Sequence, residues 1–325
     1  MSGKQKEMGV VAEQYCIDYP QLSSLGLARL LKQESPLLFA SVEAARDCVR
    51  YYRGAKGEVK RNQVRGKIIP RSIPEPISVK YEPYQLPKIN DNCLILADLH
   101  IPFHDKTSIE IAVKYGVEHK VNTVILLGDI IDCYELSKFV KKPNVATFQD
   151  EREYFWELID YINEQLPHAQ IFWYEGNHEK RWQAYMLSHA PEIFGVTDFT
   201  IPELFNLREL GITWIDRCQY IRAGKMNILH GHEYFGGMSS VNPARWLFLK
   251  SKSNACMAHR HQVSVHSGKD INGKITTCWS IGCLCQLNPE YMPLNEWAQG
   301  FAHIHLFKEG NFLMKNHTII NHTIY

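Results

Sequence analysis

The side chains with the clearest capacity for chemistry in this sequence are aspartates, asparagines and histidines that directly follow short apolar runs. Five apolar runs are each followed at once by such residues: Asp98-Leu99-His100, Gly128-Asp129-Ile130-Ile131-Asp132, Gly176-Asn177-His178-Glu179, His230-Gly231-His232 and His259-Arg260-His261. An ionised carboxylate at the end of a buried strand is strongly disfavoured unless a positive charge compensates it. Metal ions can supply that charge. We therefore expect a metal cage formed by these residues: Asp98, His100, Asp129, Asn177, His230, His259 and His261.

Each of these fragments alone has an ordinary structural explanation, as a polar pair or a turn. Five of them in one chain, each at the end of an apolar run, are much harder to explain separately. Oxygen and imidazole ligands suit Mn²⁺, Fe, Zn²⁺ or Ni²⁺, and this mixture does not choose among them. The nine cysteines form no C-x-x-C pair, and the closest couple is Cys283 with Cys285. We therefore expect reduced thiols and no zinc ligation by cysteine.

The apolar runs themselves predict buried strands over residues 93–97, 123–127, 171–174, 226–229 and 255–258. Helical spacing of apolar residues predicts helices over 108–115 and 148–162. Alternating strands and helices indicate an α/β domain whose site lies at the strand ends. Further strands are expected over 263–266, 275–280, 301–307 and 312–319, and we expect these to form a second sheet that packs on the first.

This series of motifs resembles that of the calcineurin-like metallophosphoesterases, and the resemblance covers roughly residues 91–325. The last motif of that family is usually Gly-His-x-His, and this chain has Ala258 in place of the glycine. The resemblance implies a four-layer α-β-β-α sandwich with two metal ions, which activate a hydroxide and are bridged by Asp129. Asp98, His100 and His261 would bind one ion. Asn177, His230 and His259 would bind the other.

The resemblance also implies two catalytic residues outside the coordination shell. His178 would protonate the leaving alkoxide or stabilise charge on the phosphoryl oxygens, and Asp132 would orient it. A structural alternative for Asp132 is a helix-capping role. The run Ser280–Cys285, with Tyr291, Trp297 and Gly300-Phe301 downstream, resembles a subset of these enzymes found in bacteriophages and prophages.

The amino-terminal part of the chain is basic: residues 1–88 carry fifteen Lys and Arg against nine Asp and Glu. Apolar spacing predicts helices over 22–34 and 41–54, and Arg46, Arg50 and Arg53 share a stripe on the second helix. We expect a helix-turn-helix-like module over 1–57 that binds nucleic acid through these arginines; the alternative is a solvated helix face. A linker rich in proline and basic residues would follow over 58–90, and the phosphoesterase domain would span 91–325.

These observations favour a metal-dependent phosphodiesterase or nuclease that acts on DNA or RNA. The protein Ser/Thr phosphatases of the superfamily are disfavoured because Cys133-Tyr134 follows Asp132 where they carry Arg-Gly. One alternative is a small-molecule phosphodiesterase or nucleotide phosphatase whose amino-terminal module mediates protein assembly. Another is a catalytically silent, metal-binding nucleic-acid-binding protein. No export signal or run of about eighteen apolar residues occurs. We therefore expect a cytoplasmic protein with no membrane partner, of phage origin and acting in a bacterial host, and of open oligomeric state.

Overall fold

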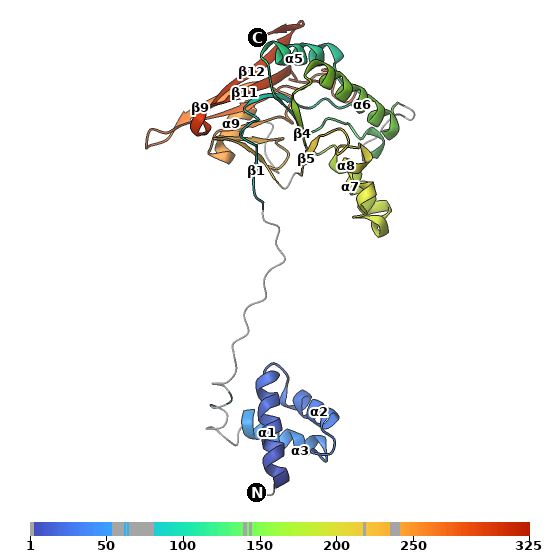
Figure 1. Ribbon diagram of the computed structural model, residues 1–325, viewed down its shortest axis with the longest axis vertical. Coiled ribbons are helices and arrows are strands. Elements are labelled where there is room, and N and C mark those ends of the chain that lie inside the picture. The colour runs from blue at the N-terminus through green and yellow to red at the C-terminus, as the bar shows by residue number, and fades with distance from the viewer. Residues whose placement is uncertain are drawn as a thin grey trace. The chain divides into compact units, whose positions relative to one another are not determined.

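The structure of the chain is a computed structural model that describes residues 3–53, 62, 64, 81–138, 142, 145–216, 219–234 and 241–325 (Figure 1). It divides into two compact units, Met1–Val79 and Lys80–Tyr325. Most of the linker expected over 58–90 lies outside the described residues. No helix within the described ranges is long and apolar enough to cross a membrane.

The described part of the first unit consists of α1 (Gly3–Asp18), α2 (Ser24–Glu34) and α3 (Val42–Arg53), packed around a small apolar core. The sequence predicted α2 and α3, whose N-termini are capped by serine side chains. Ser23 accepts a hydrogen bond from the Gly26 N–H, and Ser41 accepts one from the Ala44 N–H. The sequence did not predict α1, because this helix buries just Ala12 and Cys16 and has no apolar stripe.

The second unit is built on a sheet whose middle strands are parallel. Within the described residues the strands lie in the order β13 (Thr323–Ile324), β12 (Phe312–Ile320), β11 (Gln299–Leu306), β2 (Asn92–Leu96), β3 (Thr123–Leu127), β4 (Gln170–Tyr174) and β5 (Thr213–Ile215). β2, β3, β4 and β5 are parallel, whereas β11 is antiparallel to β2. Parallel strands end at the same edge, so the residues after β2, β3 and β4 lie side by side.

A second sheet packs against the first. Its described strands lie in the order β1 (Tyr84–Gln85), β6 (Ile221–Ala223), β7 (Met226–Leu229), β8 (Ala255–Met257), β10 (Ile275–Ser280) and β9 (Ser264–Lys269). The expectation that the strands after residue 262 form this sheet is wrong in part, because β11 and β12 extend the first sheet instead. The run of apolar residues in a strand shows that the strand is buried, but it does not show which other strand it pairs with. β1, within the expected linker, pairs with β6.

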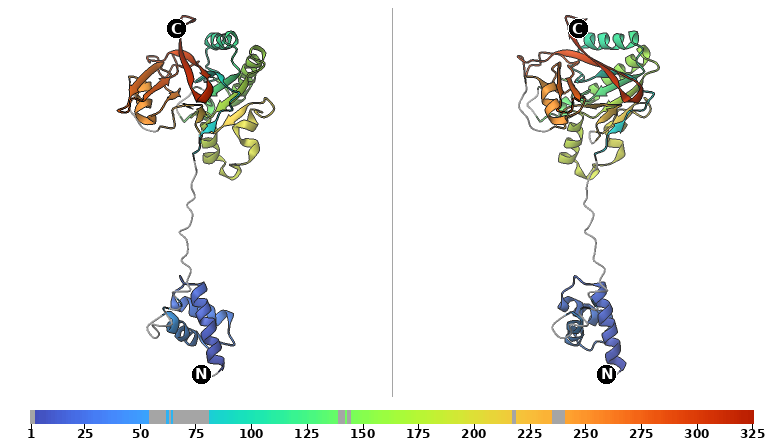
Figure 2. Two further views of the ribbon diagram at one scale, coloured as in Figure 1. Left: turned by 60° about the vertical axis from the view of Figure 1, so that its left-hand side comes forward. Right: turned by 90° about the vertical axis from the view of Figure 1, so that its left-hand side faces the viewer.

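Helices cover the outer faces of the two sheets. α5 (Lys106–Glu118) and α6 (Phe148–Gln165) pack on the first sheet, and α9 (Pro243–Ser251) packs on the second. The remaining described helical segments are α7 (Lys180–His189), α8 (Ile201–Leu204), η1 (Tyr134–Leu136), η2 (Pro191–Ile193), η3 (Thr197–Phe199) and η4 (Lys308–Gly310). In the left view of Figure 2, α9 and strands β8, β9 and β10, in orange, lie on the opposite side from α5 and α6, in blue-green and green.

The alternation of side chains along each strand explains the layers. In β2, Leu94 and Leu96 contact the helix layer, whereas Cys93 and Ile95 face the second sheet. Both faces are apolar because both are covered, which is why the run reads as continuously apolar in the sequence. The arrangement confirms the predicted four-layer α-β-β-α sandwich.

Candidate metal centre

The predicted ligands lie at neighbouring strand ends of the two sheets. Asp98, Asp129 and Asn177 follow β2, β3 and β4, which are adjacent in the first sheet. His230 and His259 follow β7 and β8, which are adjacent in the second. Leu229 at the end of β7 pairs in register with Met257 at the end of β8, so the residues that follow them leave the sheet at the same level.

The backbone turns at most of these positions. The following predicted ligands have φ angles between 50° and 66°: Asp98, His100, Asp129, His259 and His261. Side chains other than glycine rarely adopt this left-handed conformation, and when they do they concentrate at functional sites. The turns aim the side chains into one space between the two sheet edges instead of along the strands.

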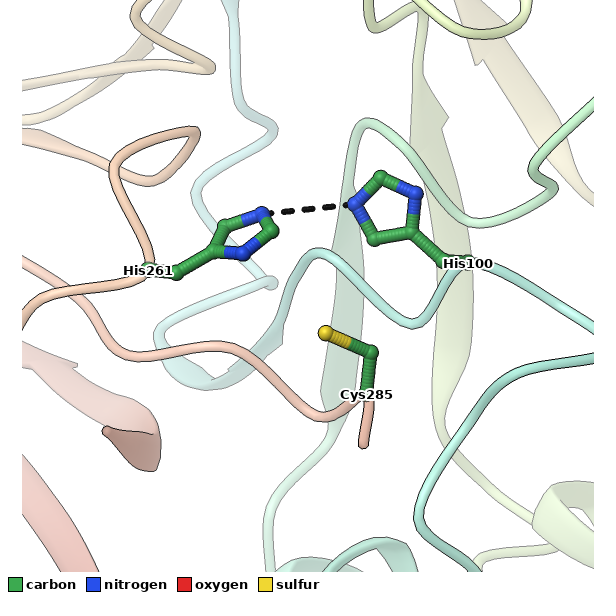
Figure 3. A group of neighbouring side chains, drawn as sticks. All are labelled: His100, His261 and Cys285. Carbon is green, nitrogen blue, oxygen red and sulfur yellow. Dashed lines mark hydrogen bonds between the residues drawn. The ribbon is translucent and has the colours of Figure 1, made fainter. Parts of the chain in front are cut away.

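One group of side chains gathers around Asp98. The His261 Nε2 atom lies 3.3 Å from the Asp98 Oδ1 atom and 3.3 Å from the His100 Nε2 atom. The His100 Nδ1 atom lies 3.0 Å from the Asp132 Oδ1 atom and donates its proton there, so the lone pair of Nε2 faces His261. Figure 3 shows the two imidazole rings of His100 and His261 facing each other through these nitrogens.

A second group gathers around Asp129. Asp129, His230 and His259 place one potential ligand atom each within 4.8 Å of one another. The His230 Nδ1 atom donates to the Leu127 carbonyl over 2.7 Å, and the Nε2 atom, which would bind a metal, lies 3.3 Å from the Asp129 Oδ2 atom. Such a hydrogen bond from the rear nitrogen fixes the tautomer and orientation of a metal-binding imidazole.

Several buried polar atoms of these groups lack a hydrogen-bond partner among the described residues: Asp98 Oδ1, Asn177 Oδ1, His230 Nε2 and His261 Nδ1. Asp98 and His230 are fully buried, so water outside the protein does not satisfy them. Buried carboxylate and amide oxygens without donors are costly unless a cation binds them. The seven predicted ligands therefore fit divalent metal ions, and the site has the composition of a dinuclear centre.

The protonation of the histidines reflects how the site balances charge without cations. Burial lowers the pKa of His230 and His261, but Asp129 and Asp98 raise it by more, to about 10 and about 9 respectively. Burial, with His230 nearby, lowers the pKa of His259 to about 4. Because a metal binds only neutral imidazole, it must displace the protons of His230 and His261.

Asp132 and His178 lie beside the cage. The Asp132 Oδ1 atom is 3.1 Å from the His178 Nδ1 atom, and it also accepts from His100. These hydrogen bonds outweigh burial and hold the pKa of Asp132 below its usual range. The His178 Nε2 atom lies 3.8 Å from the Asp129 Oδ2 atom. Asp132 is placed to position both the predicted catalytic histidine and one predicted ligand, and it caps none of the described helices.

Three residues outside the predicted ligand and catalytic sets also contact the site. The Arg181 guanidinium donates to the Asp132 carbonyl over 2.9 Å and to the His178 Nε2 atom over 3.0 Å. Glu233 accepts from the N–H groups of His230 and Gly231 over 3.1 and 2.6 Å. Glu179 accepts from backbone N–H groups of the loop that carries Asp129. Glu179 and Glu233 each lie within a few residues of a predicted ligand in the sequence, and this proximity was the one feature of the sequence that pointed to them.

Glu179 is fully buried and holds two motifs together. Its Oε2 atom accepts from the N–H groups of Asp129 and Gly176 over 3.0 and 2.9 Å, and its Oε1 atom accepts from Ile130 and Ile131 over 2.7 and 3.4 Å. Burial and Asp129 raise its pKa to about 7. The loop that carries Asp129 passes so close to residue 176 that this position requires glycine, since a Cβ at Gly176 would lie 2.3 Å from the Asp129 N atom.

The three predicted nucleic-acid-binding arginines lie in the first unit and differ in their contacts. Arg53 donates to the carbonyls of Leu22, Tyr19 and Cys16, the last over 3.2 Å, and so ties α3 to the segment between α1 and α2. Arg46 pairs with Glu43 over 3.4 Å, and Arg50 is exposed. Of the three, Arg50 has the most accessible side chain.

Comparison with known proteins finds a phage relative and a set of solved structures. The Gene 54 protein of Mycobacterium phage L5 is 23% identical over 231 residues, which cover 64% of this chain and 86% of that protein. Among solved structures, a single mutant of Vps29 from Entamoeba histolytica covers 72% of this chain and 96% of its own at 10% identity and a TM-score of 0.38. A dimetal phosphatase from Danio rerio covers 70% of this chain and 95% of its own at 13% identity and a TM-score of 0.35.

The family model described as calcineurin-like phosphoesterase matches residues 92–281, which is more than half of the chain. The matched range runs from the first residue of β2 to the residue after β10, and it includes every residue of the predicted cage. This chain therefore belongs to the calcineurin-like phosphoesterase family and is a hydrolase of phosphoester bonds.

Proposed function

We propose that this chain is a dinuclear-metal phosphodiesterase that acts on nucleic acid, as a nuclease. The observation that carries the proposal is the combination of a complete cage with a cationic, tyrosine-lined pocket directly beside it. Asp98, His100 and His261 would hold one ion and Asn177, His230 and His259 the other, with Asp129 as the ligand that the two sites would share. When bound, the two cations lower the pKa of water and neutralise charge on the phosphoryl oxygens.

The protein's own side chains supply orientation and proton transfer. His178 directs its Nε2 atom toward the cage and its Nδ1 proton toward Asp132, so Nε2 is the atom that meets the leaving oxygen. Arg181 donates to that same nitrogen, which makes it a second donor for phosphoryl oxygens once substrate is bound. Asp132 fixes the ring in one tautomer, as a carboxylate partner does in other histidine-based sites.

The pocket beside the cage supports a substrate that contains a nucleoside. It has a volume of about 590 Å³ and is lined by Tyr220, Tyr234, Lys180 and Arg222, together with His232 and Glu233. The His232 ring lies 5.3 Å from the His230 ring and 6.4 Å from the His259 ring, so the pocket adjoins the cage. Tyrosine faces stack on bases, and the positive side chains of Lys180 and Arg222 attract phosphates.

Two further observations agree with a nucleic-acid substrate. Residues 1–88 carry an excess of basic residues, and a tethered binding unit raises the local concentration of its ligand near the active site. The similarity to a phage protein supports a phage origin, and with it action inside a bacterial host. Arg50 is the residue through which we expect the first unit to contact phosphates.

The test compares the full chain with His178→Ala and Asp129→Ala, supplied with Mn²⁺, Zn²⁺, Fe²⁺ or Ni²⁺, on a generic phosphodiester, a monoester, and single- and double-stranded DNA and RNA. We expect diester cleavage by the wild type, loss of turnover with retained metal for His178→Ala, and loss of both for Asp129→Ala. Full activity in His178→Ala would overturn its assigned role. No hydrolysis of any substrate would favour the silent binding protein.

The pocket provides the test of substrate class. Tyr220→Ala is expected to raise KM for oligonucleotides while leaving the generic diester unaffected, and the exposed Tyr154→Ala serves as the matched control. Unchanged KM for oligonucleotides in Tyr220→Ala, with no salt-dependent binding of the full chain to DNA or RNA, would instead support the small-molecule phosphodiesterase or nucleotide phosphatase whose amino-terminal module mediates assembly.

A further inference from the structure

A cysteine-bearing segment is fixed against the loop that carries the first two predicted ligands. The Leu284 N–H donates to the carbonyls of Ala97 and Asp98 over 3.2 Å each. The Gln286 N–H donates to the Phe103 carbonyl over 2.9 Å. Between these two anchors lies Cys285, which forms an isolated β-bridge with His104. Its backbone position relative to Asp98 and His100 is therefore set by hydrogen bonds on both sides.

The Cys285 thiol points into the cage. Figure 3 shows its sulfur directed toward the space between the His100 and His261 rings. One atom from each of these three residues lies within 4.8 Å of the other two, and all three residues are buried. The His100 and His261 Nε2 atoms are 3.3 Å apart, and the nearby Asp98 Oδ1 atom has no hydrogen-bond partner among the described residues. Two imidazole nitrogens and one sulfur thus lie around a common point, and the Asp98 Oδ1 atom lies 3.3 Å from the His261 Nε2 atom.

We propose that the Cys285 Sγ atom is an additional ligand of the metal ion held by Asp98, His100 and His261. The proposal rests on the dinuclear centre proposed above and extends its ligand set. It departs from the expectation of no zinc ligation by cysteine. That expectation came from the absence of paired cysteines along the sequence, whereas the partners of Cys285 are histidines distant in sequence.

A thiolate at this position makes the two metal sites chemically different. Thiolate is a soft ligand that favours Zn²⁺ and Fe²⁺ over Mn²⁺ and Mg²⁺. The group around Asp129 holds no cysteine among the described residues, so its oxygen and nitrogen ligands keep a broader preference. We therefore expect a mixed centre in which the Asp98 site retains zinc or iron more tightly than the Asp129 site.

Cys283 provides a matched control in the same segment. It is also buried, and its thiol donates to the Ala298 carbonyl over 3.7 Å. Its sulfur accepts a hydrogen bond from the Cys285 thiol, so a serine at position 283 preserves an acceptor beside Cys285. Cys283→Ser therefore changes the same segment without removing the proposed ligand.

The experiment loads wild type, Cys285→Ser and Cys283→Ser with Co²⁺ and records absorption spectra. We expect a sulfur-to-cobalt charge-transfer band in the near ultraviolet for wild type and Cys283→Ser. Cys285→Ser should lose this band and keep the visible d–d bands, which show that the protein is folded and still binds cobalt. X-ray absorption of the zinc form should show a sulfur at about 2.3 Å besides nitrogen and oxygen at about 2.0–2.1 Å, and the sulfur should be absent in Cys285→Ser.

The possible failures are distinguishable. Visible d–d bands without a charge-transfer band in wild type would overturn the role of Cys285 and leave the dinuclear centre standing. No cobalt binding by any of the three proteins would overturn the centre itself, and the thiolate ligand with it. As a second readout, we expect Cys285→Ser to bind zinc about tenfold more weakly or worse, because losing even an outer-sphere partner of a ligand lowers metal affinity by about tenfold. Its affinity for Mn²⁺ should change little. Equal losses for both metals would contradict the assignment.

Discussion

Replacing Glu179 with glutamine tests whether the cage is held by backbone hydrogen bonds to a buried carboxylate. The carboxylate accepts four N–H groups, two on each oxygen, from Asp129, Gly176, Ile130 and Ile131. Glutamine has one acceptor oxygen, so its amide group would face two N–H donors. A buried donor without an acceptor costs about 1–3 kcal/mol, so we expect Glu179→Gln to lower the free energy of unfolding by about 2–6 kcal/mol.

The same substitution should weaken metal binding, because the Asp129 N–H is one of the groups released and Asp129 is the proposed bridging ligand. Outer-sphere partners of metal ligands typically contribute 10- to 100-fold in affinity, and we expect a loss of about that size. Urea unfolding of the metal-free protein gives the stability, and competition with a chromophoric chelator gives the affinity. Both are measured at about pH 9, above the pKa of about 7 of Glu179 and the pKa of about 8 of the control residue Glu151.

Glu151 provides the matched control, since it is equally buried and accepts from the Cys133 and Tyr134 N–H groups over 2.7 Å each. Neither of these groups belongs to a proposed ligand. Glu151→Gln should therefore cost stability with little change in metal affinity. Wild-type metal affinity in Glu179→Gln would refute the reasoning, and so would an equal loss of affinity in the two variants, because the effect would then not pass through Asp129.

Further predictions concern pH, metal binding, the loop glycine and the arginines. Burial raises the pKa of Glu151 to about 8, so the folded protein holds a proton that the unfolded chain releases. The stability that this group contributes therefore falls as pH rises from about 4.5 to about 8. Urea titrations should show a flatter dependence of stability on pH in Glu151→Gln. Metal binding at about pH 7.5 should release about three protons, from His230, His261 and the Cys285 thiol, and affinity should weaken as pH falls. Calorimetry in two buffers of different ionisation enthalpy measures this release, and zero release would contradict the assigned protonation. Gly176→Ala should remove metal binding while circular dichroism stays unchanged, because the added Cβ would meet Asp129 and no helix. Arg53→Ala should destabilise the first unit by about 1.5–3 kcal/mol, as measured by hydrogen exchange of the full chain. Arg50→Ala should change the stability of that unit by less than about 0.5 kcal/mol and weaken nucleic-acid binding. The reverse pattern would contradict the assigned roles.

The cage could be predicted from the sequence because its ligands share one local signature. Each follows a short apolar strand directly, and the strand ends meet at one edge whichever helices connect them. Asp98, Asp129 and His230 are examples, since no long-range information was needed to place them near a site. The helices α2 and α3 were predicted for a similar reason, since their apolar spacing and serine caps are local features.

The residues that escaped prediction act through contacts that no local pattern records. Glu179 binds backbone N–H groups, which every sequence has, and Arg181 reaches Asp132 and His178 from the first turn of α7. Cys285 approaches His100 and His261 through pairing between distant segments. The placement of β11 beside β2 likewise depends on pairing, and their apolar patterns alone would fit either sheet.

The backbone of the cage suggests what metal binding does and does not contribute to folding. Five proposed ligands adopt left-handed φ angles, at a cost of about 1–2 kcal/mol each, which together approaches the whole stability of an ordinary domain. The structure holds these turns through hydrogen bonds that involve no metal, from Glu179 to the Asp129 loop and from the His259 N–H to the Asp98 Oδ2 atom over 2.8 Å. The scaffold therefore sets the ligand positions in advance, and the cations relieve the unpaired buried oxygens and nitrogens. On this reasoning the metal-free protein keeps its fold but is less stable, and the substitutions that disrupt the cage most are those at the carboxylates that hold its turns.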